Sequence, residues 1–322
     1  MSETHEIDDQ NDAFADAIFL TGATASGKTA LGVEIARAIN ADVVSMDSMA
    51  IYRRMDVGVA KPTREERAEI AHHMIDLVEP TQEYSTADYL RDAANAVRDA
   101  RAQGKRALFV GGTPLYLKAI LFGVFDSPAP DPELRRQLRE MEDAAPGALH
   151  RELARVDPVA AARLHPHDVK RVARALEVFR LSGAPISQLQ NQFSGSPRVD
   201  PRRVFILTRD RAALYERINA RVDEMMRDGF LEETRALTAA NALGPTARQA
   251  LGYRELASAL SGETTLESAV ELLKQRTRNF AKRQETWFRS LEKIGARRIV
   301  ADGRALADLR AEICGIVEAE SL

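Results

Sequence analysis

The sequence predicts an α/β protein: a parallel sheet flanked by helices, interrupted along the chain by an all-helical insertion domain. Two observations support this prediction. Short apolar runs alternate with amphipathic segments, a pattern typical of parallel strands joined by crossover helices. Residues 127–132 hold several prolines, which disfavour helix and central strand, and the segment after them shows helical patterns only.

The most specific local signal is a Gly-rich motif. An apolar run at 17–20 is typical of a buried strand, and Gly22-x-x-x-x-Gly27-Lys28-Thr29 then fits the phosphate-binding loop pattern. In such a loop, successive N–H groups and the positive end of the next helix face an anion. The Lys28 ammonium adds charge, and the Thr29 hydroxyl suits Mg²⁺. We therefore expect a P-loop NTPase-like sheet that binds a diphosphate. The predicted diphosphate-binding residues of the loop are Gly22, Ala23, Thr24, Ala25, Ser26, Gly27, Lys28 and Thr29.

Further apolar runs predict the other strands. They lie at 42–47, 74–78, 107–110, 204–207 and 298–301. Ser85 or Thr86 is expected to cap a helix that ends at Gly104. Ligands of such sheets bind beyond the carboxyl ends of the strands. We therefore expect the phosphate loop, Asp47 and Gly111-Gly112-Thr113 to share one crevice.

The domain boundaries follow from composition. Residues 1–16 are acidic and polar, and we predict a disordered tail there. Residues 17–125 and 200–322 are expected to form the α/β catalytic core with C-terminal helices. Within it, 214–237 is expected to be one long helix and 306–318 a terminal helix. Residues 126–199 are expected to form the insertion, with arginines along its helix faces.

Composition excludes several classes. At 322 residues and a formal net charge of -3, any nucleic-acid contact must be a local patch. The single Cys314 excludes a disulfide scaffold and is expected to be buried. No apolar run approaches the roughly 20 residues that span a bilayer, and the N-terminus resembles no signal or transit peptide. We expect a cytoplasmic protein.

The chemistry of the crevice stays open at this level. Most phosphate-loop proteins transfer a γ-phosphoryl group and hold Mg²⁺ with an acid that ends a second strand. The run at 107–110 is followed instead by Gly-Gly-Thr. Asp47 fits a metal ligand, a general base or a simple turn residue. Gly111 and Gly112 fit either a strand-to-helix turn or the close approach of a ligand.

A basic run near the C-terminus is the last candidate feature. Residues 274–289 carry six basic residues against one acid, with three aromatic side chains among them. This pattern fits a solvated helix face, and it equally fits a surface where bases stack and phosphates meet cations. The His72-His73 pair and the pair His165 and His167 have no nearby Cys, so we predict no zinc site there.

Taken together, these motifs resemble one family. In register along the chain stand Gly22-Ala-Thr-Ala-Ser-Gly-Lys-Thr29, Asp47-Ser-Met-Ala-Ile-Tyr52-Arg53, Gly111-Gly-Thr-Pro-Leu-Tyr116, residues 171–176, Arg248-Gln-Ala-Leu-Gly-Tyr253 and Lys282-Arg-Gln-Glu-Thr-Trp-Phe-Arg289. They resemble the motifs of tRNA dimethylallyltransferases, also called tRNA isopentenyltransferases. The resemblance covers residues 17–289.

The resemblance implies prenyl transfer. The family moves a dimethylallyl group from dimethylallyl diphosphate to N6 of adenosine 37, 3′-adjacent to the anticodon, in tRNAs reading codons that begin with U. By motif, Asp47 would remove the amine proton and Thr113 would contact the reacting centre. Lys28 and Arg217 would stabilise the leaving diphosphate, which Arg221 would also help to grip. Thr29 would lie near Mg²⁺.

The resemblance also implies an RNA-binding set. It comprises Asp47, Ser48, Met49, Ala50, Thr113, Arg135, Arg171, Val172, Ala173, Arg174, Ala175, Arg248, Gln249, Ala250, Leu251, Gly252, Tyr253, Lys282, Arg283, Gln284, Glu285, Thr286, Trp287, Phe288 and Arg289. These residues would meet the tRNA anticodon stem-loop.

The sequence differs from the family pattern at two positions, and two alternative functions stay open. Ala23 stands where the family usually has Pro, and Pro114 where it has Gly or Met. A small-molecule or nucleotide kinase would share the loop and sheet, but the sequence lacks an acid after Val110. An RNA-binding module without chemistry would use the basic helix alone. We expect a monomer, because no apolar stripe is left unexplained.

Overall fold

The computed structural model describes residues 13–124, 128–190 and 196–320. The chain divides into two compact units. The core unit comprises Met1–Leu121 and Arg198–Leu322, and the helical unit comprises Phe122–Pro197. These borders lie within a few residues of the boundaries drawn from composition.

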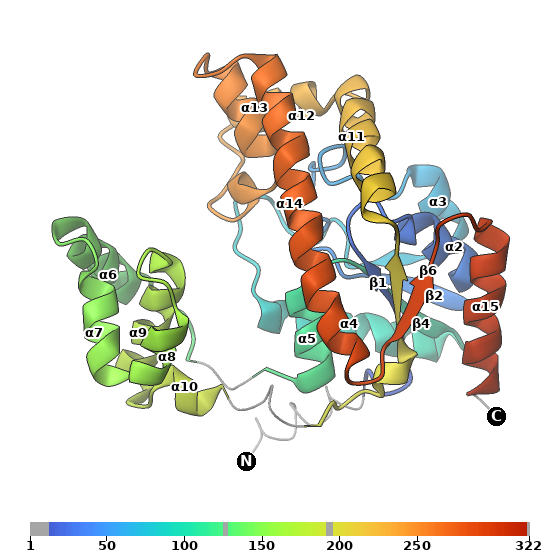
Figure 1. The fold of residues 1–322 in the computed structure, drawn as a ribbon, viewed down its shortest axis with the longest axis horizontal. Helices are drawn as coiled ribbons and strands as arrows, with labels where there is room; N and C mark the ends of the chain where they lie inside the picture. Colours follow the sequence, from blue (N-terminus) through green and yellow to red (C-terminus); the bar gives the residue numbers. More distant parts are fainter. Residues whose placement is uncertain (1–12, 125–127, 191–195, 321–322) are drawn as a thin grey trace. The chain divides into compact units, whose positions relative to one another are not determined.

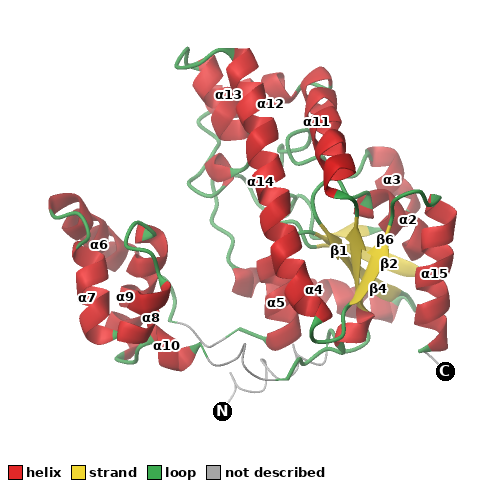
Figure 2. Ribbon diagram, in the orientation of Figure 1, coloured by secondary structure: helices red, strands yellow, loops and turns green. Residues whose placement is uncertain are grey.

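The core unit is built on one parallel sheet of six strands, in the order β3-β2-β4-β1-β5-β6. Figure 2 shows this sheet in yellow among the helices of the core unit. This confirms the predicted α/β class. The strands are β1 (Ile18–Gly22), β2 (Ala41–Ser45), β3 (His72–His73), β4 (Arg106–Gly111), β5 (Val204–Thr208) and β6 (Arg297–Val300). Every residue of β1 and β2 is buried, as expected of central strands covered on both faces.

Helices cover both faces of the sheet. Successive side chains of each strand point to opposite faces, so each face offers apolar side chains to a layer of helices. Ile18 and Leu20 pack with residues of α2 (Lys28–Ala38) and α15 (Leu306–Ala319), whose apolar side chains form one cluster. Phe19 points to the other face and stacks on Phe109, with ring centroids 5.0 Å apart. Figure 1 shows α2 and α15 side by side at the sheet. The other core helices are α3 (Arg64–Glu69), α4 (Thr86–Ala102), α5 (Pro114–Phe122), η2 (Pro201–Arg203), α11 (Arg211–Arg227), α12 (Phe230–Ala239), η3 (Ala247–Gln249), α13 (Tyr253–Leu260) and α14 (Leu266–Glu292).

Two element predictions were wrong for backbone reasons. The third strand is not at 74–78 but at His72–His73, because Met74 and Asp76 adopt positive φ angles of 63° and 58° that a strand excludes. The helix expected at 214–237 is two helices. Gly229, with φ 99°, separates α11 from α12.

The N-terminal prediction also needs one correction. Residues 1–12 lie outside the described residues, but residues 13–16 form a turn. Phe14 is buried there and meets the ring of Phe109 edge-on at 5.7 Å. The chain is therefore packed before residue 17. Cys314 is buried in α15, as predicted.

The helical unit has its own apolar core. Its helices are α6 (Pro132–Ala144), α7 (Ala148–Val156), α8 (Pro158–Arg163), α9 (Val169–Ser182) and α10 (Ile186–Leu189). Leu138, Leu153, Val172 and Leu176 are completely buried in one cluster. Aspartates cap three of the helices by accepting hydrogen bonds from first-turn amides. None of the helices in the described part of the chain is apolar and long enough to cross a membrane.

Candidate active site

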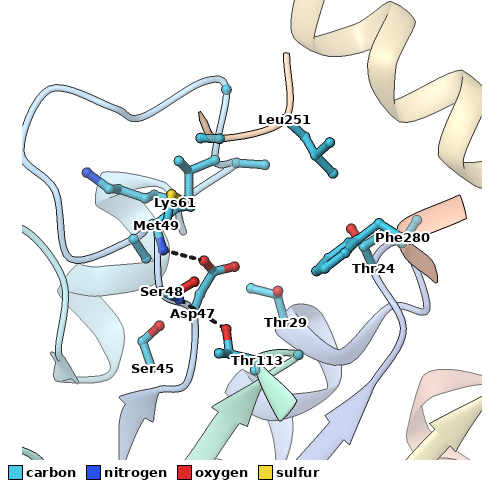
Figure 3. A pocket seen from close by; sticks show the side chains of 18 of the residues that line it. Thr24, Thr29, Ser45, Asp47, Ser48, Met49, Lys61, Thr113, Leu251 and Phe280 are labelled. Atoms are coloured by element: carbon cyan, nitrogen blue, oxygen red, sulfur yellow. Dashed lines mark hydrogen bonds between the residues drawn. The ribbon is translucent and has the colours of Figure 1, made fainter. Parts of the chain in front are cut away.

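A cavity of about 420 Å³ lies at the carboxyl ends of β1, β2 and β4 in the core unit. Lys28 and Thr29 line it from the phosphate loop, Asp47 from the end of β2, and Thr113 from the end of β4. Figure 3 shows the Asp47, Thr29 and Thr113 side chains together around this space. The expected convergence of the three strand ends therefore occurs.

The phosphate loop has the backbone that its glycines predict. Gly27 adopts φ 100° as the N-cap of α2, in the left-handed region that disfavours other residues. A Cβ on Gly22 would lie 2.5 Å from the Leu207 carbonyl oxygen, so β5 approaches the loop too closely for a side chain. The Lys28 ammonium donates to the Ala23 carbonyl at 3.2 Å. These contacts hold the loop against α2 and β5.

The pKa of the Lys28 ammonium is lowered by its surroundings. Burial, and after it the positive charge of Arg221, lower the pKa of the Lys28 ammonium to about 8, while the negative charge of Asp47 opposes both. Burial likewise lowers the pKa of the Arg221 guanidinium, again opposed by Asp47. Lys28 and Arg221 thus line the same cavity as the Asp47 carboxylate, and Lys61 and Arg283 line it as well. Such a site favours an anionic ligand, whose charge would raise both pKa values again.

Asp47 and Thr113 are held by one hydrogen-bonded turn. The Asp47 carboxylate accepts from the Met49 amide at 2.8 Å, and the Thr113 hydroxyl oxygen accepts from the Ser48 amide at 3.1 Å. The Thr113 amide donates to the Met46 carbonyl at 3.1 Å. One Asp47 oxygen is therefore fixed by the backbone, and the carboxylate lines the cavity (Figure 3).

Gly111, the last residue of β4, and Gly112, which follows it, have protein neighbours too close for a side chain. A Cβ on Gly111 would lie 2.3 Å from the Met46 carbonyl oxygen, and one on Gly112 would lie 2.6 Å from the Gln284 amide nitrogen. Both residues also line the cavity. The atoms that exclude a side chain belong to Met46, just after β2, and to Gln284 of α14. This accounts for both glycines by a tight strand-to-helix turn, the first of the two alternatives.

The two predicted diphosphate-gripping arginines lie in different places. Arg221 lines the cavity, whereas Arg217 does not and instead donates to the Ala25 carbonyl at 2.9 Å. Arg209, which no motif indicated, donates in the same way to the Ser26 carbonyl at 2.7 Å. Both guanidinium groups approach within 3.7 Å of the position of a Cβ on Gly27. They support the phosphate loop from outside the cavity.

The predicted RNA-binding run on α14 divides by helix phase. Lys282, Arg283, Thr286 and Arg289 are exposed, whereas Gln284 and Phe288 are buried at 3% and 2% exposure. Glu285 and Trp287 are partly buried. Arg283 and Gln284 line the cavity, whereas the Phe288 ring is packed in the core. Consecutive helical residues point in different directions, so the expected RNA contact of this run stays a prediction that must be divided by helix face.

The predicted run at 248–253 divides in a similar way. Gln249, Ala250 and Leu251 line the cavity. Gly252 is the N-cap of α13, and the Arg248 guanidinium donates to the Leu243 carbonyl. The Tyr253 ring is completely buried, so only its backbone is available for the RNA contact predicted at this residue.

In the helical unit, two of the expected RNA-binding arginines are engaged internally. Arg135 and Arg174 both form ion pairs with Glu177, whose side chain is fully buried. Val172 and Ala175 are buried in the core of the unit, so only their backbone is available for the predicted RNA contact. Ala173 is partly buried. Arg171 is 76% exposed and has Asp168 at 3.3 Å.

Sequence reasoning missed the segment 56–62, of which residues 58–62 form one wall of the cavity. The Glu233 carboxylate on α12 accepts from the Asp56, Val57 and Gly58 amides at 2.8–3.0 Å. The Tyr253 hydroxyl also donates to it, at 2.6 Å. No local pattern signals these contacts, because Glu233 lies far along the chain.

Lys61 secures the other end of the same segment. Its ammonium donates to the Tyr52 carbonyl at 2.7 Å and to the carboxylates of Asp56 and Asp76. The Lys61 side chain is only 1% exposed, so these bonds replace its hydration. The segment is therefore fixed at both ends.

The fold and the cavity define the class of protein. It is a phosphate-loop α/β protein whose cavity is lined by the cationic side chains of Lys28 and Arg221 and by the Asp47 carboxylate. A family model described as IPP transferase matches residues 50–291. A tRNA dimethylallyltransferase of Geobacter metallireducens is 45% identical over 279 residues, which cover 84% of this chain and 89% of that protein.

Solved structures agree with this relationship. The crystal structure of a tRNA isopentenylpyrophosphate transferase from Bacillus halodurans is 34% identical, with a TM-score of 0.67, and covers 95% of this chain and 97% of its own. A eukaryotic dimethylallyltransferase, solved in snapshots of its action on tRNA, is 27% identical, with a TM-score of 0.76, covering 93% and 77%. The chain belongs to the IPP transferase family, and it is a transferase.

Proposed function

We propose that the protein transfers a dimethylallyl group from dimethylallyl diphosphate to N6 of adenosine 37 in tRNAs that read codons beginning with U, giving N6-(dimethylallyl)adenosine. One observation carries the proposal: Asp47 lines the same cavity as Lys28 and Arg221. Prenyl transfer needs such a cavity, in which an anionic leaving group and a proton acceptor lie on opposite sides. The two relatives are named as dimethylallyltransferases that act on tRNA, and these names support the choice of a dimethylallyl donor and a tRNA acceptor.

The donor's diphosphate would bind at the phosphate loop. Its negative charge would meet the loop amides, Lys28 and Arg221, while Arg217 and Arg209 support the loop from behind. The bond that breaks is C–O, and the bridging oxygen leaves with the diphosphate. Charge that develops on that oxygen is stabilised by groups already in place, an effect worth several kcal/mol, on the order of one oxyanion-hole donor.

The acceptor adenine would lie on the Asp47 side. As nitrogen attacks the allylic carbon, the Asp47 carboxylate takes the N6 proton, and a positioned base contributes about 10²- to 10⁴-fold in rate. The Thr113 oxygen accepts from Ser48, which leaves its O–H free to donate at the reacting centre. The base must leave the anticodon-loop stack to reach this cavity.

We propose that Mg²⁺ binds with the donor and that Thr29 contributes a ligand. The donor set fits: the Thr29 hydroxyl lines the cavity beside Asp47 (Figure 3). The described residues contain no group of three or more acidic, His or Cys ligands, so the diphosphate and water would supply most of the coordination. When bound, Mg²⁺ would neutralise charge on the leaving diphosphate.

The test is mass analysis of tRNA nucleosides after incubation with dimethylallyl diphosphate and Mg²⁺. We expect added prenyl mass on one adenosine, located by sequencing to position 37, and none in a tRNA with guanosine there. ATP-dependent phosphorylation of an acceptor without prenylation would instead identify a kinase.

We also propose that the protein acts as a monomer. Light scattering during size-exclusion chromatography tests this.

A further inference from the structure

Gln284, in the C-terminal half of α14, joins the two glycine-containing segments of the site. Its side-chain oxygen accepts from the Thr24 amide of the phosphate loop at 2.9 Å. Its side-chain nitrogen donates to the Gly112 carbonyl at 2.5 Å. The residue is 3% exposed, and both ends of its amide are bonded to backbone groups. We call this pair of hydrogen bonds the Gln284 bridge.

The surroundings of Gly112 are fitted to this bridge. A Cβ there would lie 2.6 Å from the Gln284 nitrogen, 3.0 Å from the Gly22 carbonyl oxygen and 3.5 Å from the Lys28 Cε. The phosphate loop, α14 and the turn after β4 therefore meet at one residue. A side chain at this position would push them apart.

The bridge continues to the acceptor side of the cavity. The residue after Gly112 is Thr113, whose amide donates to the Met46 carbonyl and whose hydroxyl oxygen accepts from the Ser48 amide. Met46 and Ser48 flank Asp47. A run of hydrogen bonds and one peptide link thus leads from the phosphate loop to both neighbours of Asp47.

We propose that Gln284 is a positioning residue that sets the separation between the phosphate loop and the Asp47–Thr113 side of the cavity. This inference rests on the proposed function. The loop would hold the carbon to be attacked, and the other side would hold the attacking nitrogen and its base. These atoms must approach to about 3–3.5 Å, and a displacement of about 1 Å can cost 10²-fold in rate. Loss of the bridge should therefore slow the chemical step while both substrates still bind.

The experiment compares Gln284→Leu with Gln275→Leu in the full-length protein. Gln275 lies on the same helix, is exposed and offers a matched control. We expect kcat of Gln284→Leu to fall about 10- to 100-fold, the loss that misplaced reactants produce. The KM for tRNA and the Kd for inorganic pyrophosphate should stay close to those of the unchanged protein. Gln275→Leu should change none of these quantities.

Hydrogen exchange provides a readout that needs no activity. The peptide covering residues 22–29 should exchange faster in Gln284→Leu, because the Thr24 amide loses its acceptor, and should be unchanged in Gln275→Leu. If the unchanged protein transfers no prenyl group, the proposed function fails while this measurement still tests the bridge. Exchange that is equal in both variants would show that the bridge does not hold the loop.

Two kinetic outcomes would overturn the inference. A kcat for Gln284→Leu equal to that of Gln275→Leu would show that the bridge has no role in the chemistry. A loss of tRNA affinity that accounts for the whole loss of kcat/KM would make Gln284 an RNA contact. If Gln284→Leu does not fold, Gln284→Glu repeats the kinetic test, because its carboxylate still accepts from the Thr24 amide but repels the Gly112 carbonyl and so breaks one half of the bridge.

Discussion

The phosphate loop and the basic run of α14 are both short contiguous patterns, yet the structure treats their residues differently. A phosphate loop binds an anion mainly through its backbone N–H groups, so the sequence can propose the motif as a unit whatever its side chains do. Thr24, Ala25, Lys28 and Thr29 of the motif line the cavity. In α14, Lys282 and Arg283 are exposed while the next residue, Gln284, is buried and holds the loop itself. A motif that acts through the backbone can be assigned whole, whereas a helical motif must be divided by face before roles are given.

The largest effect should come from the acceptor side of the cavity. Asp47→Asn keeps the size of the side chain but removes the base, and we expect kcat to fall about 10²- to 10⁴-fold with tRNA affinity retained. Single-turnover prenylation measures the chemical step. Asp308→Asn, an exposed carboxylate on α15, is the control. An unchanged single-turnover rate in Asp47→Asn would remove the base from the mechanism.

The second effect concerns the helical unit, where the sequence predicts that Arg135 and Arg174 bind RNA. Glu177→Gln should leave Arg135 and Arg174 without their shared carboxylate and destabilise the unit by about 2–3 kcal/mol, below the value for a fully buried pair because both arginines are partly exposed. Urea unfolding, followed by exchange in residues 130–180, measures this loss.

Glu140→Gln, an exposed residue of α6 paired with Arg136, is the control and should change stability little. If Glu177→Gln lowers tRNA affinity without destabilising the unit, the two arginines act on RNA directly. That result would move them back to the role that the sequence suggested.

The third effect is the pH dependence of anion binding beside Lys28 in the cavity. Because the pKa of Lys28 is about 8 in the free protein, an anion should bind more weakly as the pH rises through this value. The bound anion raises that pKa, so the complex holds the proton that the free protein loses. The Kd for pyrophosphate should then rise up to about tenfold per pH unit above pH 8, as linkage requires.

Lys28→Met is the control for this pH dependence. Pyrophosphate titrates as well, but its own titration is common to both proteins and cancels in the ratio of their Kd values. A ratio that does not vary between pH 7 and 9 would mean that Lys28 keeps its proton throughout that range.

These contrasts show what the sequence predicts and where it stops. The sequence predicts that Lys28, Asp47 and Thr113 meet in one cavity, because strand ends in a parallel sheet share one edge. The Gln284 bridge and the Glu233 contacts to the 56–58 amides were not predicted, because their partners lie far apart along the chain. The third strand was misplaced because positive φ angles at Met74 and Asp76 leave no mark in an apolar pattern.

The smallest effect tests the exposed face of α14 directly. Lys282→Ala removes an exposed charge from the run, and we expect tRNA to bind a few-fold more weakly, with the slope of log K against log salt reduced by about 1. Lys293→Ala, just beyond the helix, is the control. A phosphate contact weakens binding to all tRNAs alike, because it carries no sequence information. An unchanged slope would mean that this face is only solvated, and the RNA would then have to be held by the cavity-lining Gln249–Leu251 segment and by the helical unit.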